Sequence, residues 1–452
     1  MKKRNQDMLH GPLLGNIISY TVPIILTGVL QLLFNAADLV IVGRFCGSVS
    51  VAAVGATGSL THLIVNLFIG MSVGAGVTVA HAIGGRRGEE VHRTVHTAML
   101  TALLSGAVLT VVGVSLSPLF LEMMGTPETV LSLSSIYMRI YFGGITFTMV
   151  YNFCASILRA AGDTRSPLLY LTIAGVVNVG LNIVFVTVLD MNVAGVALAT
   201  VISQAISALG VTVTLMRRED ACCLRLGKLR IYAVQLKKIL RIGLPAGIQS
   251  SLFSISNVMV QSSVNSFGDV FMSGNAAAGN LEGFVYTALN AYSQTAVNFV
   301  GQNMGAGKLD RVKKILLTCM ACVAVTGIVM GWSVYGFGRQ LLSFYITDSP
   351  EAVAYGIIRL AYMCLPYFLC GMMDVATGAL RGMGDSFTPM VISVLGICGV
   401  RITWLLTVFR MVHTPQCLYL TYPLTWIVTL AIQTVAFVRT FRKHSGMAAN
   451  HT

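Results

Sequence analysis

Carboxyl and amide groups within apolar sequence are the residues of this chain that could do chemistry. The stretch Tyr20–Gly43 is apolar enough to lie in a bilayer, yet it carries Asn35 and Asp38 well past its start. A carboxylate at membrane depth is costly, and such residues by default mark pathways for ions or substrates. Pro23 precedes the aspartate in the same stretch, where it removes a backbone donor and favours a bend. We therefore expect an ion-binding group in the first membrane helix.

Two other acidic residues, Glu282 and Asp374, also fall well inside apolar runs. A cavity-facing Glu282 would attract a cationic substrate or take part in coupling, and the alternative is a structural hydrogen bond to a neighbouring helix. Asp374 has the same two interpretations. Gln249 and Asn257 belong to a group of amides nearby, although polar residues in membrane helices often only join one helix to another. These four residues are our candidates for a cavity in the second half of the chain.

Charged and aromatic side chains within the apolar runs supply further candidates. Arg401 is a candidate partner for a buried carboxylate, because an unpaired guanidinium there would be costly. Aromatic side chains could meet a cationic ligand through their ring electrostatics, with ordinary packing as the alternative; these are Phe34, Tyr137, Tyr151 and Tyr286.

The composition identifies the class of protein that must position these groups. Of 452 residues, 55% are hydrophobic and only 10% are charged, whereas about a quarter are charged in soluble domains. The mean hydropathy is +0.77, and apolar runs of membrane-spanning length recur along the chain. We predict an all-α integral membrane protein with twelve transmembrane helices, at 13–43, 50–82, 92–117, 129–158, 165–189, 193–216, 239–267, 272–302, 312–336, 352–380, 387–409 and 416–438.

The basic residues define a topology. Of the 30 lysines and arginines, 24 fall at the two termini, in the loops after even-numbered spans or at the first three positions of the spans that follow these loops. By the positive-inside rule both termini are cytoplasmic, and the protein is a multi-pass protein of the cytoplasmic membrane. This explains the net charge of +13 without a nucleic-acid partner. Cys319 and Cys322 form a CxxC within a span, but no second ligand pair accompanies them, so we predict no metal site.

An internal repeat divides the chain into halves. The stretch Leu158–Pro167 reappears as Leu380–Pro389, offset by 222 residues, and the same offset aligns Pro23 with Pro245 and Asn35 with Asn257. Six spans separate the copies, so the repeat is parallel, and transporters of this construction place the substrate between halves. The basic linker between spans six and seven then separates an N-lobe, 1–226, from a C-lobe, 227–452. We predict two pseudo-symmetric lobes of six helices.

The repeated motif also has a mechanical reading. Gly162 and Gly384 would let the chain leave a helix in a left-handed turn. Asp163 and Asp385 could then cap the following helix. The motif would then form the tight turn that joins two consecutive spans.

These features together resemble the multidrug and toxic compound extrusion (MATE) family, of the MOP flippase superfamily, over essentially the whole chain. The paired LRGxGDTxxP-like turns carry the resemblance, and the N-x-x-D of Asn35 and Asp38 after a proline resembles the DinF-like branch. The resemblance implies that Asp38 couples transport to protons and that the first helix bends at Pro23 when Asp38 is protonated.

The chain departs from its relatives at two positions. The glutamate that sodium-coupled relatives carry in span seven is replaced by Phe253, and the second acidic residue of the N-lobe site is replaced by Asn182. Asp38 would then work with neutral partners, for which the candidates are Asn35, Asn178, Asn182 and Thr200.

We therefore expect a multidrug efflux antiporter that exports amphipathic cationic compounds in exchange for protons, with the two lobes rocking to alternate access. It would act as a monomer. Because no nucleotide motif is present, we expect no cofactor. One alternative is sodium coupling through Glu282 and Asp374. A second alternative is a lipid-linked oligosaccharide flippase. A third is a membrane-embedded enzyme, and the scarcity of histidine and carboxylate pairs inside the spans disfavours the enzyme.

Overall fold

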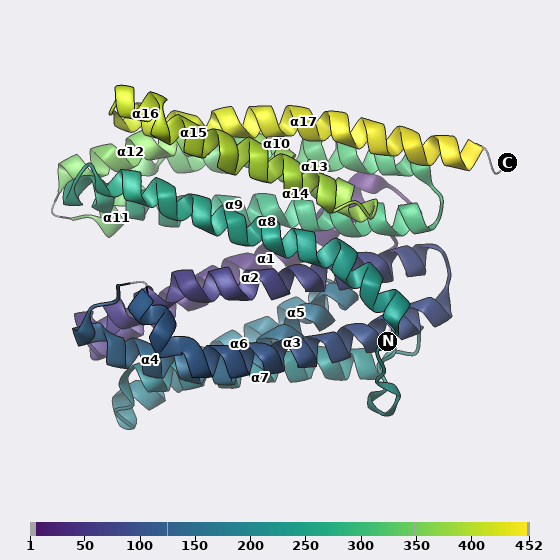
Figure 1. Ribbon diagram of the computed structural model, residues 1–452, viewed down its shortest axis with the longest axis horizontal. Helices are drawn as coiled ribbons and strands as arrows, with labels where there is room; N and C mark the ends of the chain where they lie inside the picture. Colours follow the sequence, from purple (N-terminus) through teal and green to yellow (C-terminus); the bar gives the residue numbers. More distant parts are fainter. Residues whose placement is uncertain (1–5, 124, 348, 450–452) are drawn as a thin grey trace. The chain divides into compact units, whose positions relative to one another are not determined.

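The computed structural model describes residues 6–123, 125–347 and 349–449, and every regular element among them is a helix (Figure 1). The first half contains α1 (Leu13–Phe45), α2 (Ser48–Gly84), α3 (Gly88–Met123), α4 (Glu128–Gly143), α5 (Ile145–Ala160), α6 (Arg165–Ile183), η1 (Val184–Val188) and α7 (Asn192–Met216). The second half contains η2 (Leu226–Lys228), α8 (Ala233–Asn265), α9 (Asp269–Gly305), α10 (Leu309–Gly336), α11 (Gly338–Tyr345), α12 (Pro350–Cys364), α13 (Tyr367–Gly382), α14 (Phe387–Ser393), η3 (Val394–Gly399), α15 (Val400–Leu406), α16 (Val408–Met411) and α17 (Pro415–Ala449). Helices satisfy their own backbone polar groups, as a lipid environment requires.

The predicted spans all appear as helices. Within the described ranges, eight helices are long and apolar enough to cross a membrane, or ten if two bent pairs each count as one span. The bent pairs are α4 with α5, at 47°, and α12 with α13, at 43°. The remaining two predicted spans are α8 and α9, which are long enough but more polar. The chain is therefore an all-α membrane protein, as predicted.

The repeated turns form as expected. Gly162 and Gly384 adopt φ values of +90° and +92°, in the left-handed region that glycine tolerates. Asp163 Oδ1 accepts a hydrogen bond from the backbone N–H of Ser166 at 2.9 Å. Asp385 Oδ1 accepts the equivalent bond, from the N–H three residues later, at 3.0 Å. The capping role predicted for both aspartates is confirmed.

The described chain forms two compact units. Unit 1 contains residues 22–251 together with Gln6 and Asp7, and unit 2 contains residues 8–21 and the residues from Leu252 onward.

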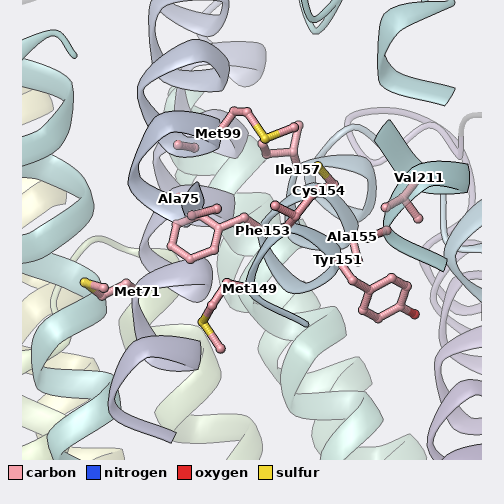
Figure 2. Close-up of a cluster of buried hydrophobic side chains, with 14 of the residues drawn as sticks. Met71, Ala75, Met99, Met149, Tyr151, Phe153, Cys154, Ala155, Ile157 and Val211 are labelled. Atoms are coloured by element: carbon pink, nitrogen blue, oxygen red, sulfur yellow. The ribbon is translucent and has the colours of Figure 1, made fainter. Parts of the chain in front are cut away.

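In unit 1, side chains of α2, α3, α5 and α7 form one apolar core. Figure 2 shows part of it, with Met71 and Ala75 from α2, Met99 from α3, Phe153 from α5 and Val211 from α7. Phe153 and Val211 are completely buried. Because lipid tails are as apolar as these side chains, close packing rather than exclusion of water holds such helices together.

In unit 2, α9 packs against α10, α12 and α13. Leu281 of α9 shares an apolar core with Leu360 of α12. Helix α13 also approaches α9 closely, because a Cβ on Gly378 would lie 2.5 Å from the carbonyl oxygen of Ser293. Ser293 also donates a hydrogen bond to the carbonyl oxygen of Asp374 at 2.7 Å.

The first helix of each half begins in one unit and ends in the other. Helix α1 passes from unit 2 to unit 1 after Thr21, two residues before Pro23, and α8 passes from unit 1 to unit 2 after Ser251. The lobes expected at 1–226 and 227–452 divide the chain at the linker, whereas the compact units change over within these two helices.

Contacts made by the beginnings of α1 and α8, and by the residues just before α1, explain why these segments belong to unit 2 and unit 1 respectively. Within unit 1, Lys238 of α8 forms an ion pair with Glu90 of α3. Within unit 2, the amide of Asn303 donates to the carbonyl oxygen of Met8 at 3.0 Å. Thr21 of α1 is also hydrogen-bonded to Thr295 of α9, with 2.8 Å between the two hydroxyl oxygens.

The beginning of α8 packs on α2 with almost no space between the backbones. Gly243 and Gly247 of α8 face Gly70 and Gly74 of α2. Within each helix, three residues lie between the two glycines. A Cβ on Gly70 would lie 2.2 Å from the backbone nitrogen of Gly247. Such small-residue pairs let membrane helices approach closely.

We predict that Gly70→Ala destabilises the protein by about 1–3 kcal/mol, because the added methyl group overlaps the backbone of α8. The measurement is thermal unfolding of the purified protein in detergent. The matched control is Gly55→Ala in the same helix, where a Cβ would meet no atom within 4 Å. Equal unfolding temperatures for the two variants would contradict the close contact.

Candidate ion-coupling site

Asp38 forms a polar cluster with two asparagines of α6 in unit 1. The Nδ2 group of Asn182 donates one hydrogen bond to Asp38 Oδ1, at 2.5 Å, and another to Asn178 Oδ1, at 3.2 Å. Asn178 and Asn182 are buried, whereas Asp38 is half-buried. The side-chain oxygen of Asn182 is also buried and has no hydrogen-bond partner. The cluster therefore combines one carboxyl group with neutral partners.

Local helix geometry brings these residues together. Asn178 and Asn182 are four residues apart and so lie on one face of α6. The π-helix η1 starts two residues after Asn182, and such irregular turns recur at functional sites. Helix α1 comes close to α6 at Gly175, where a Cβ would lie 1.8 Å from the ring of Phe34. The absence of a side chain at that position permits the contact.

Apolar side chains surround the polar cluster. Ile41 and Val42 of α1 pack with Val186 and Val196, and Tyr137 of α4 packs against this group. The Asp38 carboxyl group lies within electrostatic range of the Tyr137 hydroxyl group. From its sequence position, Tyr137 is only one of several aromatic residues expected within the spans.

In the described part of the chain, the other residues proposed for this site do not join the hydrogen-bonded cluster. Asn35 is exposed, and among the described residues it makes no hydrogen bond to Asp38. Thr200 donates to the carbonyl oxygen of Val196 in its own helix, at 3.0 Å. Helix α1 continues through Pro23, whose carbonyl oxygen accepts a hydrogen bond from Thr27 at 2.7 Å.

In unit 2, Glu282 is neutralised by an arginine. Arg359 of α12 binds it through two nitrogens, with Nε 3.0 Å from Glu282 Oε2 and Nη2 paired with Oε1. The same guanidinium donates to Asn275 Oδ1, which also accepts from the hydroxyl group of Tyr419 at 2.8 Å. This is the geometry of the structural alternative for Glu282.

Asp374 of α13 has a different environment. Tyr286 and Asn290 of α9 lie beside its carboxyl group, and the charge of Arg381 acts on it. Its Oδ2 atom is buried without a hydrogen-bond partner. Unlike Glu282, Asp374 keeps an acceptor that a ligand could use.

Arg401 does not fill the role of carboxylate partner. It is buried, contacts Asn257 Oδ1 at 3.4 Å and lies 4.3 Å from the ring centroid of Tyr422. No carboxylate of the described ranges forms an ion pair with it. Gln249 is buried near the end of the part of α8 that belongs to unit 1, whereas Asn257, Glu282 and Asp374 belong to unit 2.

The partners of Glu282, which are Arg359, Asn275 and Tyr419, were not predicted from the sequence. A signal was available, because Arg359 is one of few basic residues inside a predicted span and needs a compensating charge. The described residues contain no group of three or more His, Cys, Asp or Glu side chains able to hold a metal ion.

Comparison with known proteins places the chain in a family. The family model MatE matches residues 23–184 and 245–405, one match in each half. The "Probable multidrug resistance protein YoeA" of Bacillus subtilis is 28% identical over 393 residues, covering 85% of this chain and 84% of that protein. YpnP of the same organism, with the same description, is 28% identical over 406 residues, covering 87% and 88%.

The fold is also shared with solved structures. A crystal structure of MATE in complex with MaL6 superposes with a TM-score of 0.90 at 19% sequence identity, covering 99% of this chain and all of that one. The chain belongs to the MATE family. It is a multi-pass membrane transporter and not an enzyme.

We predict that Glu282→Gln lowers the stability of the protein by about 3–5 kcal/mol, because it leaves the buried charge of Arg359 without a carboxylate. Adding Arg359→Met should restore most of the loss. Thermal unfolding in detergent measures both effects, with Glu351→Gln, an exposed carboxylate of the same unit, as the control. A Glu282→Gln protein of unchanged stability that no longer transports would instead establish a functional role for Glu282.

Proposed function

We propose that this protein is an efflux antiporter that exports amphipathic cationic compounds in exchange for protons, with Asp38 as the coupling group. The hydrogen-bonded cluster of Asp38, Asn182 and Asn178 is the observation that carries the proposal. The two Bacillus subtilis relatives, both described as multidrug resistance proteins, support the export of drug-like compounds.

An asparagine suits both protonation states of a carboxyl group. The Asn182 amide donates a hydrogen bond to the ionised carboxylate through Nδ2, and its unpartnered Oδ1 could accept a hydrogen bond from the neutral acid after a half-turn of the amide. An ionised aspartate at position 182 could not donate at all. The neutral partner thus lets one carboxyl group bind and release a proton without a second charge beside it.

In this scheme, protonation of Asp38 from outside favours release of the substrate and bending of α1 at Pro23. Release of the proton inside then favours loading of the next substrate, while the two lobes rock to alternate access. The transporter would work as a monomer in the cytoplasmic membrane, with both termini inside and with no cofactor.

The proposed sodium-coupled alternative depends on Glu282 and Asp374. The ion pair between Glu282 and Arg359 occupies both oxygens of Glu282, which leaves Asp374 as the acidic group with a free acceptor. Coupling through Asp38 therefore fits the described contacts better.

We predict that Asp38→Asn abolishes proton-driven export while the protein still folds, because an amide cannot bind and release a proton at physiological pH. The assay follows a fluorescent cation in proteoliposomes, with proton and sodium gradients imposed separately. Asp190→Asn, an exposed carboxylate of the same unit, should transport normally. Unchanged export by Asp38→Asn, or export by the wild type that responds only to sodium at fixed pH, would overturn the assignment.

A further inference from the structure

The linker between α7 and α8 is an ordered basic loop fixed to α3. We call residues 217–232 the linker loop. Its Arg225 backbone N–H donates to His96 Nε2 of α3 at 3.1 Å. The hydroxyl group of the next residue, Thr97, accepts from the Tyr232 N–H at 3.1 Å. These contacts hold the backbone on both sides of the basic residues, so their side chains project from a fixed framework.

The linker loop and the start of α3 enclose a groove of about 690 Å³. Three exposed basic residues of the loop, Arg225, Lys228 and Arg230, line it. Glu89 and His92 line it from α3, and the charges of Arg225 and Lys228 both reach His92. The groove therefore has a positive field on the loop side.

The acidic residues of the groove are already paired. Glu89 forms an ion pair with Arg93, with 2.9 Å between Glu89 Oε1 and Arg93 Nε. Asp220 forms a hydrogen-bonded ion pair with Arg218. Burial acts to raise the pKa of Asp220, but Arg218 and a backbone N–H outweigh it and hold that pKa below its ordinary value. Asp220 is therefore ionised and engaged, and it does not neutralise the rest of the loop.

The three basic side chains are not engaged in this way. Within the described part of the chain, no carboxylate forms an ion pair with Arg225, Lys228 or Arg230. Arg230 lies over the ring of Tyr232, 5.8 Å from its centroid, which leaves its donors available. Three unpaired cations around one groove match a phosphate group, which offers several acceptor oxygens.

Apolar side chains alternate with these charges. Leu226, between Arg225 and Lys228, is 53% exposed, and Ile231 is 37% exposed. The loop connects the ends of two membrane helices, so it lies at the height of the lipid headgroups. Exposed leucine and isoleucine next to cations suit a surface that is anionic at its headgroups and apolar just below.

We propose that the groove of the linker loop binds the phosphate headgroup of an anionic phospholipid. Arg225, Lys228 and Arg230 contact the phosphate, and Leu226 contacts the acyl chains. A soluble phosphate compound offers the same charge but no acyl chain, so the apolar residues distinguish the two sources. The site is independent of the substrate and of the coupling ion.

The test measures binding of phosphatidylglycerol to the full-length protein by native mass spectrometry in a neutral detergent. The variant is Arg225→Gln/Lys228→Gln/Arg230→Gln. Each charge near an anionic lipid surface contributes about fivefold to affinity, so the triple variant should bind about a hundredfold more weakly. The matched control, Arg439→Gln/Arg442→Gln/Lys443→Gln, removes the same charges from an exposed part of α17 and should bind as the wild type does.

Three results would overturn the proposal. An equal loss of binding in both triple variants would mean that only net charge matters. Displacement of the lipid by inorganic phosphate at similar concentrations would assign the groove to a soluble anion. If the linker variant fails to fold, Leu226→Gln decides the question, because it should weaken phosphatidylglycerol binding without affecting inorganic phosphate. Unchanged lipid binding by Leu226→Gln would reject the phospholipid.

Discussion

A polar group within a bilayer must find its partner inside the protein, because lipid chains offer none. This constraint explains how the embedded charges of the chain are arranged. Asp38 is hydrogen-bonded to Asn182, Glu282 forms a hydrogen-bonded ion pair with Arg359, and Arg401 lies over an aromatic ring. Since removing either partner of a buried pair leaves a charge uncompensated, the pairs fix which helix faces pack together. The transport chemistry that we propose uses the Asp38 carboxyl group, which accepts a hydrogen bond from a neutral amide.

Much of the fold could be predicted because it depends on local sequence. Hydropathy located the spans, and the duplicated turns around Gly162 and Gly384 located the two halves. The pairing of Asp38 with Asn178 and Asn182 was also predicted, because residues four apart share a helix face and the family resemblance pointed to α6. The two broken spans are interrupted at Gly144 and at Pro366, residue types at which helices often bend, but the bends themselves were not predicted.

The side-chain partners that the sequence did not predict have a common physical cause. Which way Asn35 and Thr200 face depends on the rotation of α1 and α7 about their axes, and hydropathy does not specify it. The partner of Glu282 lies 77 residues away in the sequence, so no local pattern indicates it. The placement of α1 and α8 in two units was equally hidden, because its contacts join residues far apart in the sequence, as Lys238 with Glu90 and Thr21 with Thr295 do.

That crossing has a consequence for how such a molecule could have arisen. Each half donates the beginning of its first helix to the unit built mainly by the other half, with Thr21 bonded to Thr295 on one side and Gly243 packed on α2 on the other. A six-helix ancestor with this packing would have existed as a dimer of identical chains that exchanged these segments. Gene duplication followed by fusion through the linker loop would then have made an obligatory exchange permanent within one polypeptide.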